Sequence, residues 1–331
     1  MSERLEDDLA TALRVQIEAV DHRVGNSGTY LQEAAEVRRA AEQVPLLRQR
    51  LGLGRYLGSL TPPTGKPQFL LLFGLPNEQR QVVLKVYGRK RPGEGAIQRL
   101  WSDRGVRCVS LLDNGDEPTS WILMAAVQGR DLLGERLAGG RLIGLTTELA
   151  RTLRDAHATP VVSLPGSKPL HLGVGPHLIR VVAALERHGY TAPSGWAEWA
   201  PEVYRGGQSA FLHGDLFPGN IIRDAVDGGL RVVDCCGYVG DPAFDFARWA
   251  VRTFRPAQFG AALTAWMQGE PDMDPAVGRA MLGVEALMQA GVRELVKEER
   301  ALSWDTRDSR TRALLEYSAR SREQIPGRGL P

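Results

Sequence analysis

The chain has 331 residues, of which 41 are Lys or Arg and 39 are Asp or Glu, so its formal net charge is +2. This balance, with no dense basic run, excludes a typical nucleic-acid-binding surface and leaves small molecules as the expected partners. Hydrophobic residues make up 43% and charged residues 24% of the chain, as in ordinary globular proteins, and single cores tend to stop growing at about 250 residues, so two lobes are expected.

The first twenty residues, MSERLEDDLATALRVQIEAV, lack the basic start and apolar centre of a secretory signal. No apolar segment approaches the roughly 18 residues of a membrane-spanning helix. We therefore expect a soluble, cytoplasmic protein that does not bind a membrane. The cysteines Cys108, Cys235 and Cys236 lack the spacing of a zinc site or a redox pair, so we expect reduced, mostly buried thiols.

Apolar residues recur at helical spacing in two stretches of residues 1–50, which predicts an N-terminal extension of two amphipathic helices. Three roles fit this extension: it caps a β lobe, mediates dimerisation or covers a cleft. The sequence marks no oligomeric interface.

Residues 51–127 have the pattern of a small β-rich lobe. The runs RYLGSL, QFLLLFGL and VVLKVY are separated by turn residues, which predicts an antiparallel meander. A helix is expected from about residue 94 to 104, followed by a hairpin around Asn114, Gly115 and Asp116.

Residues 128–331 are expected to form a larger, mainly helical lobe. LIGLTTELARTLRDAHA has leucines on one side of a helix. Residues 161–199 are rich in Pro, Gly and Trp and give no clear periodicity. Farther on, IIRD and LRVV are predicted to pair as a hairpin.

Polar residues at the ends of apolar runs suit the transfer of a phosphoryl group to a hydroxyl, which requires positioning and charge neutralisation. In FLHGDLFPGNII, Asp215 lies in a tight loop where its carboxylate would orient an acceptor hydroxyl. Asn220 follows five positions later, and Asp234 ends the run LRVV, so these two residues offer oxygen ligands to one Mg²⁺ ion. Lys85 stands inside the apolar run VVLKVY, where its ammonium group needs an anion such as a nucleotide phosphate.

HGDLFPGN, followed by VVD and GDPAFDFA, with VVLKVY upstream, resembles the aminoglycoside phosphotransferase family. The segments GEGAIQRLWSDRGVRCVSLL and WILMAAVQGRDL are most similar to its streptomycin and hydroxyurea kinase branch. The resemblance implies an α+β, bilobal protein-kinase-like fold with a small antiparallel β-sheet N-lobe and a larger, mainly helical C-lobe.

For the C-lobe, the resemblance implies that Asp215 is the catalytic residue and that Asn220 and Asp234 hold Mg²⁺. The phosphoryl donor would be ATP or GTP.

For the N-lobe, the resemblance implies that Lys85 contacts the nucleotide phosphates and that Glu94 pairs with Lys85. It also implies a hinge near residues 124–129, in which Met124 and Ala126 lie beside the adenine. A solvated carboxylate at a helix N-terminus is an equally good interpretation of Glu94. Without a GxGxxG motif, the phosphate-covering loop is assigned to Thr61–Lys66.

Structural interpretations are preferred for several neighbouring polar residues. His213 is expected to hold the loop by hydrogen bonds, and Asp241 and Asp245 to act as turn and N-cap residues. His157 is interpreted as a packing residue, and the acidic run GEPDMD as a solvated loop between helices.

The resulting hypothesis is a small-molecule O-phosphotransferase whose hydroxyl acceptor is an antibiotic of the aminoglycoside type, giving resistance. A metabolic kinase acting on an amino alcohol, amino acid or sugar is the first alternative. A catalytically silent nucleotide-binding protein is the second, although such a protein has no physical need for all of Lys85, Asp215, Asn220 and Asp234.

Overall fold

The computed structural model describes residues 2–26, 31–60, 67–76, 80–135, 137–299 and 308–323. Contacts between residues divide the chain into two compact units. Unit 1 contains residues 1–102 and 108–128, and unit 2 contains residues 103–107 and 129–331. Unit 1 is built on an antiparallel sheet and unit 2 mainly on helices, which confirms the α+β class.

The sheet of unit 1 has five antiparallel strands in the order β1-β2-β3-β5-β4. The predicted meander forms strands β1 to β3, and the predicted hairpin forms β4 and β5. The strands are β1 (Tyr56–Ser59), β2 (Gln68–Gly74), β3 (Gln81–Tyr87), β4 (Leu111–Gly115) and β5 (Trp121–Ala125).

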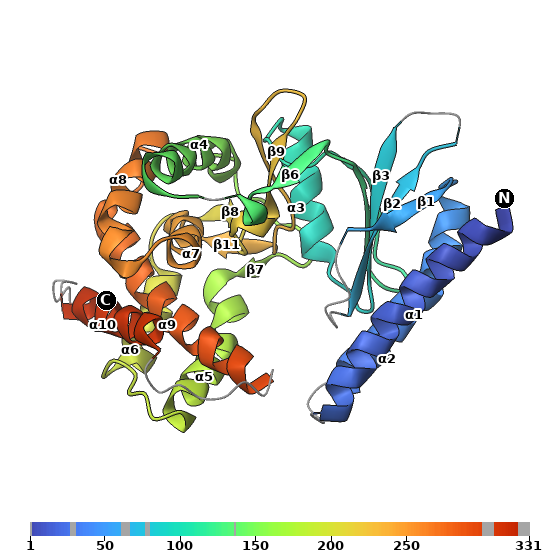
Figure 1. Cartoon of the computed structure of the whole chain (residues 1–331). Coiled ribbons are helices and arrows are strands. Elements are labelled where there is room, and N and C mark those ends of the chain that lie inside the picture. Colours follow the sequence, from blue (N-terminus) through green and yellow to red (C-terminus); the bar gives the residue numbers. More distant parts are fainter. Residues whose placement is uncertain are drawn as a thin grey trace. The chain divides into compact units, whose positions relative to one another are not determined.

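Two long helices, α1 (Ser2–Asn26) and α2 (Leu31–Arg50), cover one face of this sheet (Figure 1). Alternate residues of β2, including Phe69, Leu71 and Phe73, are buried against them in one apolar core. The two predicted N-terminal helices are therefore present and pack on the β-sheet of unit 1.

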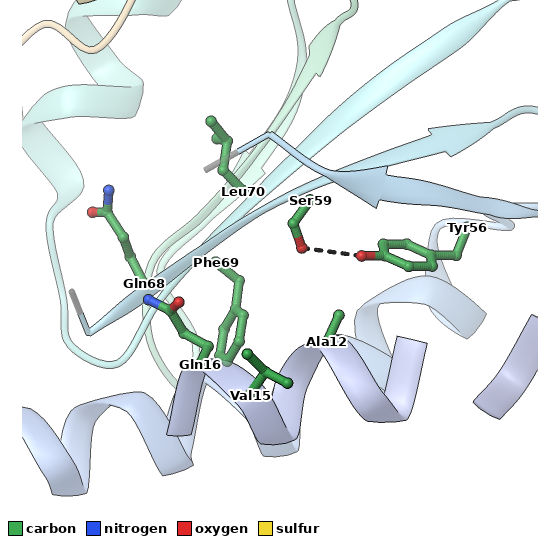
Figure 2. A pocket seen from close by; sticks show the side chains of 8 residues that line it. All are labelled: Ala12, Val15, Gln16, Tyr56, Ser59, Gln68, Phe69 and Leu70. Atoms are coloured by element: carbon green, nitrogen blue, oxygen red, sulfur yellow. Dashed lines mark hydrogen bonds between the residues drawn. The ribbon is translucent and has the colours of Figure 1, made fainter. Parts of the chain in front are cut away.

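A cavity of about 270 Å³ remains between α1 and strands β1 and β2 (Figure 2). The Tyr56 hydroxyl and Ser59 Oγ are 3.0 Å apart at its wall. Among the described residues that line it there is no carboxylate, Lys, Arg or His, so the lining that the structure describes offers no charged group to a metal-bound phosphate.

The opposite face of the sheet carries Lys85, because successive side chains of β3 alternate and its neighbours Leu84 and Val86 belong to the core beneath α1 and α2. Helix α3 (Pro92–Asp103) supplies Glu94 to this face. Gln98 Nε2 donates a hydrogen bond to the Val109 carbonyl at 3.1 Å, which fixes α3 to the chain entering β4.

Unit 2 is organised around helix α9, which packs against α5, α7 and α10 (Figure 1). Among the described residues, no helix combines the length and apolarity that crossing a membrane requires. The helices are α4 (Gly139–His157), α5 (Leu170–Arg187), α6 (Trp196–Arg205), α7 (Ala243–Thr253), α8 (Phe259–Gly269), α9 (Pro275–Glu299) and α10 (Ser309–Glu323), with short 3-10 helices at η2 (Leu132–Gly134), η3 (Pro218–Asn220) and η4 (Pro256–Gln258).

Two small sheets, ordered β10-β9-β6 and β7-β11-β8, hold the loops of unit 2. The predicted hairpin of IIRD with LRVV is β9 paired with β10. The strands are β6 (Gly129–Asp131), β7 (Lys168–Pro169), β8 (Ala210–Leu212), β9 (Ile221–Asp224), β10 (Leu230–Val232) and β11 (Tyr238–Gly240).

Candidate active site

The loop of residues 213–220 follows β8 and turns sharply at Gly214, whose φ is +80°. A Cβ atom at this position would lie 2.6 Å from Cδ2 of Tyr238, so both the backbone conformation and the available space require glycine. The turn places Asp215, half-buried, directly after two residues whose backbone is enclosed.

Asp245 in the first turn of α7 fixes the backbone of this loop. Its carboxylate accepts the backbone N–H groups of His213 and Gly214, both at 2.8 Å. Asp241 accepts the N–H of Ala243 at 2.8 Å and that of Gln208 at 2.9 Å. A structural role agrees with these contacts for both carboxylates, and Asp241 forms the expected turn. Asp245 is not the expected N-cap, because it lies inside α7 and its carboxylate bonds to another loop instead of to its own helix.

His157 at the end of α4 lies between two carboxylates, with Nε2 3.1 Å from Oδ2 of Asp245 and Nδ1 2.6 Å from Oε1 of Glu270. Burial alone would lower the pKa of His157, but the charge of Glu270 and the hydrogen bonds to both carboxylates raise it to about 10. Burial alone would raise the pKa of Asp245, and the contacts with His157 and its other donors lower it instead. His157 is therefore a buried cation and not simply a packing residue.

Glu270 corrects the prediction that GEPDMD is a solvated loop. Its carboxylate is buried and also accepts the indole N–H of Trp266 at 2.7 Å. Asp272 and Asp274 are exposed as expected. Glu270 is buried, unlike these two residues, because the buried His157 imidazolium requires a negative charge beside it.

His213 ties the loop to the chain that leads into Asp234. Its Nδ1 accepts the backbone N–H of Asp215 at 3.3 Å, so Nε2 carries the proton that is donated to the Val233 carbonyl at 2.7 Å. The Val233 N–H donates to the Asn220 carbonyl at 3.0 Å. Hydrogen bonds on both sides of Val233 thus place Asp234 on a segment bonded directly to Asn220.

Asn220 and Asp234 fit the requirements of Mg²⁺ ligands. The Asn220 amide nitrogen donates to the Asp215 carbonyl at 2.9 Å, and no described residue donates to its Oδ1, which is left as a ligand atom. Asp234 adopts φ of 65°, in the left-handed region that Asp tolerates better than most residues. Among the described residues no three His, Cys, Asp or Glu side chains converge on a common metal position, so this pair would share Mg²⁺ with phosphate oxygens and water.

Asp215 makes an ion pair that the sequence did not predict. Arg252 Nη1 donates to Oδ1 of Asp215 at 2.7 Å. Burial would raise the pKa of Asp215, but the charges of Arg252 and Arg248 and the hydrogen bond from Arg252 lower it. The carboxylate therefore stays ionised at neutral pH.

Arg248 lies one turn before Arg252 on α7 and is buried. Its Nε atom is 3.1 Å from Oε2 of Glu285 on α9. The Tyr204 hydroxyl donates to Oε1 of the same carboxylate at 2.6 Å. Burial, followed by the charges of Arg180, Arg248 and Arg252, lowers the pKa of His177 on α5 to about 4. Helix α7 thus places two arginines near Asp215, and their charges also act on His177 of α5.

In unit 1, Lys85 Nζ donates to Oε1 of Glu94 at 2.6 Å. Both side chains are buried, which rules out the alternative of a solvated Glu94. Lys85 Nζ also lies 4.9 Å from the centre of the Tyr87 ring.

The two residues predicted to lie at a hinge, Met124 and Ala126, are at the end of β5 and directly after it. Met124 is buried on β5, opposite Val83 of β3. The Ala126 N–H donates to the Gln81 carbonyl at 3.0 Å. The segment Thr61–Lys66, to which the phosphate-covering loop was assigned, lies outside the described residues.

The sequence contained one signal for the missed arginine. Asp245, Arg248 and Arg252 are spaced i, i+3 and i+7, which places them on one face of a single helix. His157 and Glu270 are 113 positions apart, and no local pattern joins them.

The sequence pattern of the phosphotransferase enzyme family matches residues 73–277. A choline/ethanolamine kinase family protein from Mesorhizobium loti has a similar structure, with 19% identity, a TM-score of 0.51 and coverage of 88% of this chain and 95% of that chain. An aminoglycoside-3'-phosphotransferase of type VIII has 20% identity, a TM-score of 0.51 and coverage of 76% and 98%. A thermostable mutant of aminoglycoside phosphotransferase APH(4)-Ia, in a ternary complex with ADP and hygromycin B, has 16% identity, a TM-score of 0.51 and coverage of 84% and 99%.

Comparison with curated proteins gave no match. At these identities the solved structures establish the fold alone, and they include both aminoglycoside and choline/ethanolamine kinases. The matched segment contains the candidate residues of both units, from Lys85 to Asp234. The chain therefore belongs to the phosphotransferase enzyme family and has a protein-kinase-like fold.

Proposed function

We propose that the protein is a Mg²⁺-dependent O-phosphotransferase that moves the γ-phosphate of ATP or GTP to a hydroxyl of a small molecule. One observation carries this proposal: hydrogen bonds through His213, Val233 and Asn220 link Asp215 to the segment bearing Asp234. An orienting carboxylate and two oxygen ligands on adjoining segments are what phosphoryl transfer requires. The nucleotide donor is consistent with the expected cytoplasmic location.

Asp215 orients the acceptor hydroxyl in this proposal. Arg252 holds Oδ1, and Oδ2, which accepts a long hydrogen bond from Nδ2 of Asn220 at 3.4 Å, has a further lone pair to accept the hydroxyl proton in a hydrogen bond. Because the pKa of Asp215 is lowered, the carboxylate is a weak base that positions the oxygen for in-line attack. Positioning is sufficient for a loose transition state with little bond formation to the nucleophile.

The remaining residues hold the donor. Asn220 and Asp234 ligate Mg²⁺, which would neutralise charge on the phosphates when bound. Lys85, oriented by Glu94, contacts the phosphates, and the buried location of this pair keeps the ammonium group from being fully hydrated. Met124 and the Ala126 carbonyl lie beside the adenine.

The resemblance supports an antibiotic of the aminoglycoside type as the acceptor, and a metabolic hydroxy compound is the second candidate. A specific observation favours the second: two arginines, Arg252 and Arg248, exert the strongest charge influences on Asp215. Cations there disfavour a polycationic acceptor. Inhibitory concentrations of an antibiotic panel in a sensitive bacterium expressing the protein test the resistance role, which uniform sensitivity would contradict.

The direct test is mass spectrometry of products after incubation with Mg²⁺, ATP or GTP and a mixed library of hydroxyl-bearing antibiotics and metabolites. We expect a product heavier by one phosphate, formed about 10²–10⁴-fold more slowly by Asp215→Ala. Asp272→Ala, which removes an exposed carboxylate, is the matched control and should leave the rate unchanged.

A silent nucleotide-binding protein predicts a different result. It would show no Mg²⁺-dependent hydrolysis of ATP in the absence of an acceptor, whereas an enzyme should show slow hydrolysis that Asp215→Ala depresses. Absence of both hydrolysis and product, with nucleotide bound, would reject the proposed activity.

A further inference from the structure

We propose that the acceptor carries an oxyanion group, a carboxylate or a phosphate, which Arg252 binds beside Asp215. This inference rests on the proposed phosphotransferase function and assigns the charge class of its acceptor. Arg252 would bind the oxyanion while Asp215 orients the hydroxyl of the same molecule.

Arg252 has the geometry of a ligand-binding arginine. Its side chain is 23% exposed, and the bond from Nη1 to Oδ1 of Asp215 uses one of its five N–H donors. The guanidinium carbon lies 5.3 Å from the centre of the Phe217 ring, so the aromatic face helps to orient the guanidinium plane. An oriented guanidinium with donors left over is the usual protein partner of carboxylates and phosphates.

The groups around Arg252 strengthen the positive potential. Arg248 is buried one turn earlier and is already paired with Glu285, so it contributes charge without being available for direct contact. His177 on α5 lies close enough to Arg180, Arg248 and Arg252 for the charges of these arginines to act on it. At neutral pH, His177 is uncharged and offers a hydrogen-bonding imidazole.

The same arrangement is unsuited to an ammonium group. Glu285 is occupied by Arg248 and by the Tyr204 hydroxyl, and Asp245 is occupied by His157 and two backbone N–H groups. An acceptor ammonium would therefore compete with Arg252 for Asp215, the carboxylate required for the reaction. Like-charge contacts of this kind oppose binding in interfaces, so they set specificity.

Four matched three-carbon alcohols test the inference: glycerate, glycerol 3-phosphate, glycerol and 3-amino-1,2-propanediol. They share hydroxyl groups and differ at one end, so the first two also distinguish a carboxylate from a phosphate. We expect kcat/KM for at least one anionic compound to exceed that for the amino compound about tenfold or more in the unaltered chain. The ratio should fall towards one in Arg252→Gln and invert in Arg252→Glu.

The test depends on the ratio of kcat/KM for an anionic compound to kcat/KM for the amino compound. Any Arg252 variant also disturbs Asp215 and so lowers the rates for all compounds together, and this shared loss by itself leaves the ratio unaffected. Arg205→Gln, at an exposed position on α6, is the control and should preserve the ratio. An equal or higher kcat/KM for the amino compound, or a ratio that Arg252→Gln leaves unchanged, would overturn the inference.

Two larger cations, choline and hygromycin B, separate failure of this inference from failure of the proposed function. Preferred phosphorylation of either would establish a phosphotransferase and overturn the anionic acceptor. If none of the six compounds is phosphorylated, calorimetry with glycerate and glycerol 3-phosphate decides. Saturable binding that Arg252→Gln abolishes would support the inference, and the absence of anion binding would reject it.

Discussion

His157 and Asp245 form a buried ion pair, with Nε2 3.1 Å from Oδ2, behind the loop that carries Asp215. The Asp245 carboxylate also accepts the backbone N–H groups of His213 and Gly214. The loop therefore depends on a buried negative charge, which the His157 imidazolium balances.

Replacement of His157 by Gln should destabilise the protein strongly. The change leaves Asp245 and Glu270 buried without a counter-charge, and breaking such a pair costs about 3–5 kcal/mol. Urea unfolding at pH 7 measures the free energy of unfolding. His171→Gln, in a half-buried residue of α5, is the control, with an expected effect within about 0.5 kcal/mol. Equal stability of the two variants would show that the pair contributes little.

The stabilisation from His157 should depend on pH in a defined direction. Its pKa is about 10 in the folded chain against the ordinary 6.5. A raised pKa stabilises the fold fully below about pH 6.5, and the contribution is lost as pH rises through 10. The difference in unfolding free energy between the unaltered chain and His157→Gln should therefore shrink between pH 7 and pH 10. A difference that grows with pH would contradict the charged state of His157.

Variants of the Lys85–Glu94 pair should show that its effect on stability differs from its effect on activity. Lys85→Met leaves Glu94 buried and unpaired, with an expected cost of about 3–5 kcal/mol. In the double variant Lys85→Met/Glu94→Leu, both buried charges are gone, and most of this loss should be recovered. Neither variant should phosphorylate an acceptor. Chemical unfolding and product formation measured on the same preparations test this, and an active double variant would remove Lys85 from the proposed mechanism.

Asp234 should show a trade-off between stability and metal binding. Its φ of 65° is free of strain for Gly, so Asp234→Gly should raise the unfolding free energy by about 1 kcal/mol in the absence of Mg²⁺ and nucleotide. The same variant should need at least about tenfold more Mg²⁺ for half-maximal ATP hydrolysis, because a carboxylate ligand is lost. Asp234→Asn, which keeps the backbone preference, should show the metal defect without the gain in stability. Unchanged Mg²⁺ dependence in both variants would argue against Asp234 as a ligand.

The elements that the sequence predicted have strong local signals. Strands β2 and β3 are seven-residue apolar runs between turn residues, and the loop around Asp215 is polar between apolar runs. Helix α5 was not predicted, because Gly173, Gly175 and Pro176 interrupt its periodicity. It forms because its apolar face packs on α9, and packing overrides propensity.

The short strands β6, β7, β8 and β11 have two or three residues each, too few for an alternating pattern to be recognised. The ion pairs of the candidate site also could not be predicted from the sequence. Arg252 and Asp215 are 37 positions apart, and their contact depends on how α7 packs after the chain has folded. The residue types along a helix indicate which face is polar, but they do not indicate which residue that face will contact.

Helix α7 joins three of these contacts in one rigid element: Asp245 holds the loop backbone, Arg248 anchors to α9, and Arg252 reaches the Asp215 carboxylate. Because an α-helix turns 100° per residue, inserting or deleting one residue between Asp245 and Arg252 would rotate the guanidinium about a quarter of a turn away from its partner. The seven-residue spacing between Asp245 and Arg252 therefore has to be kept for both side chains to reach their partners. This segment of α7 cannot gain or lose a single residue without separating Arg252 from Asp215.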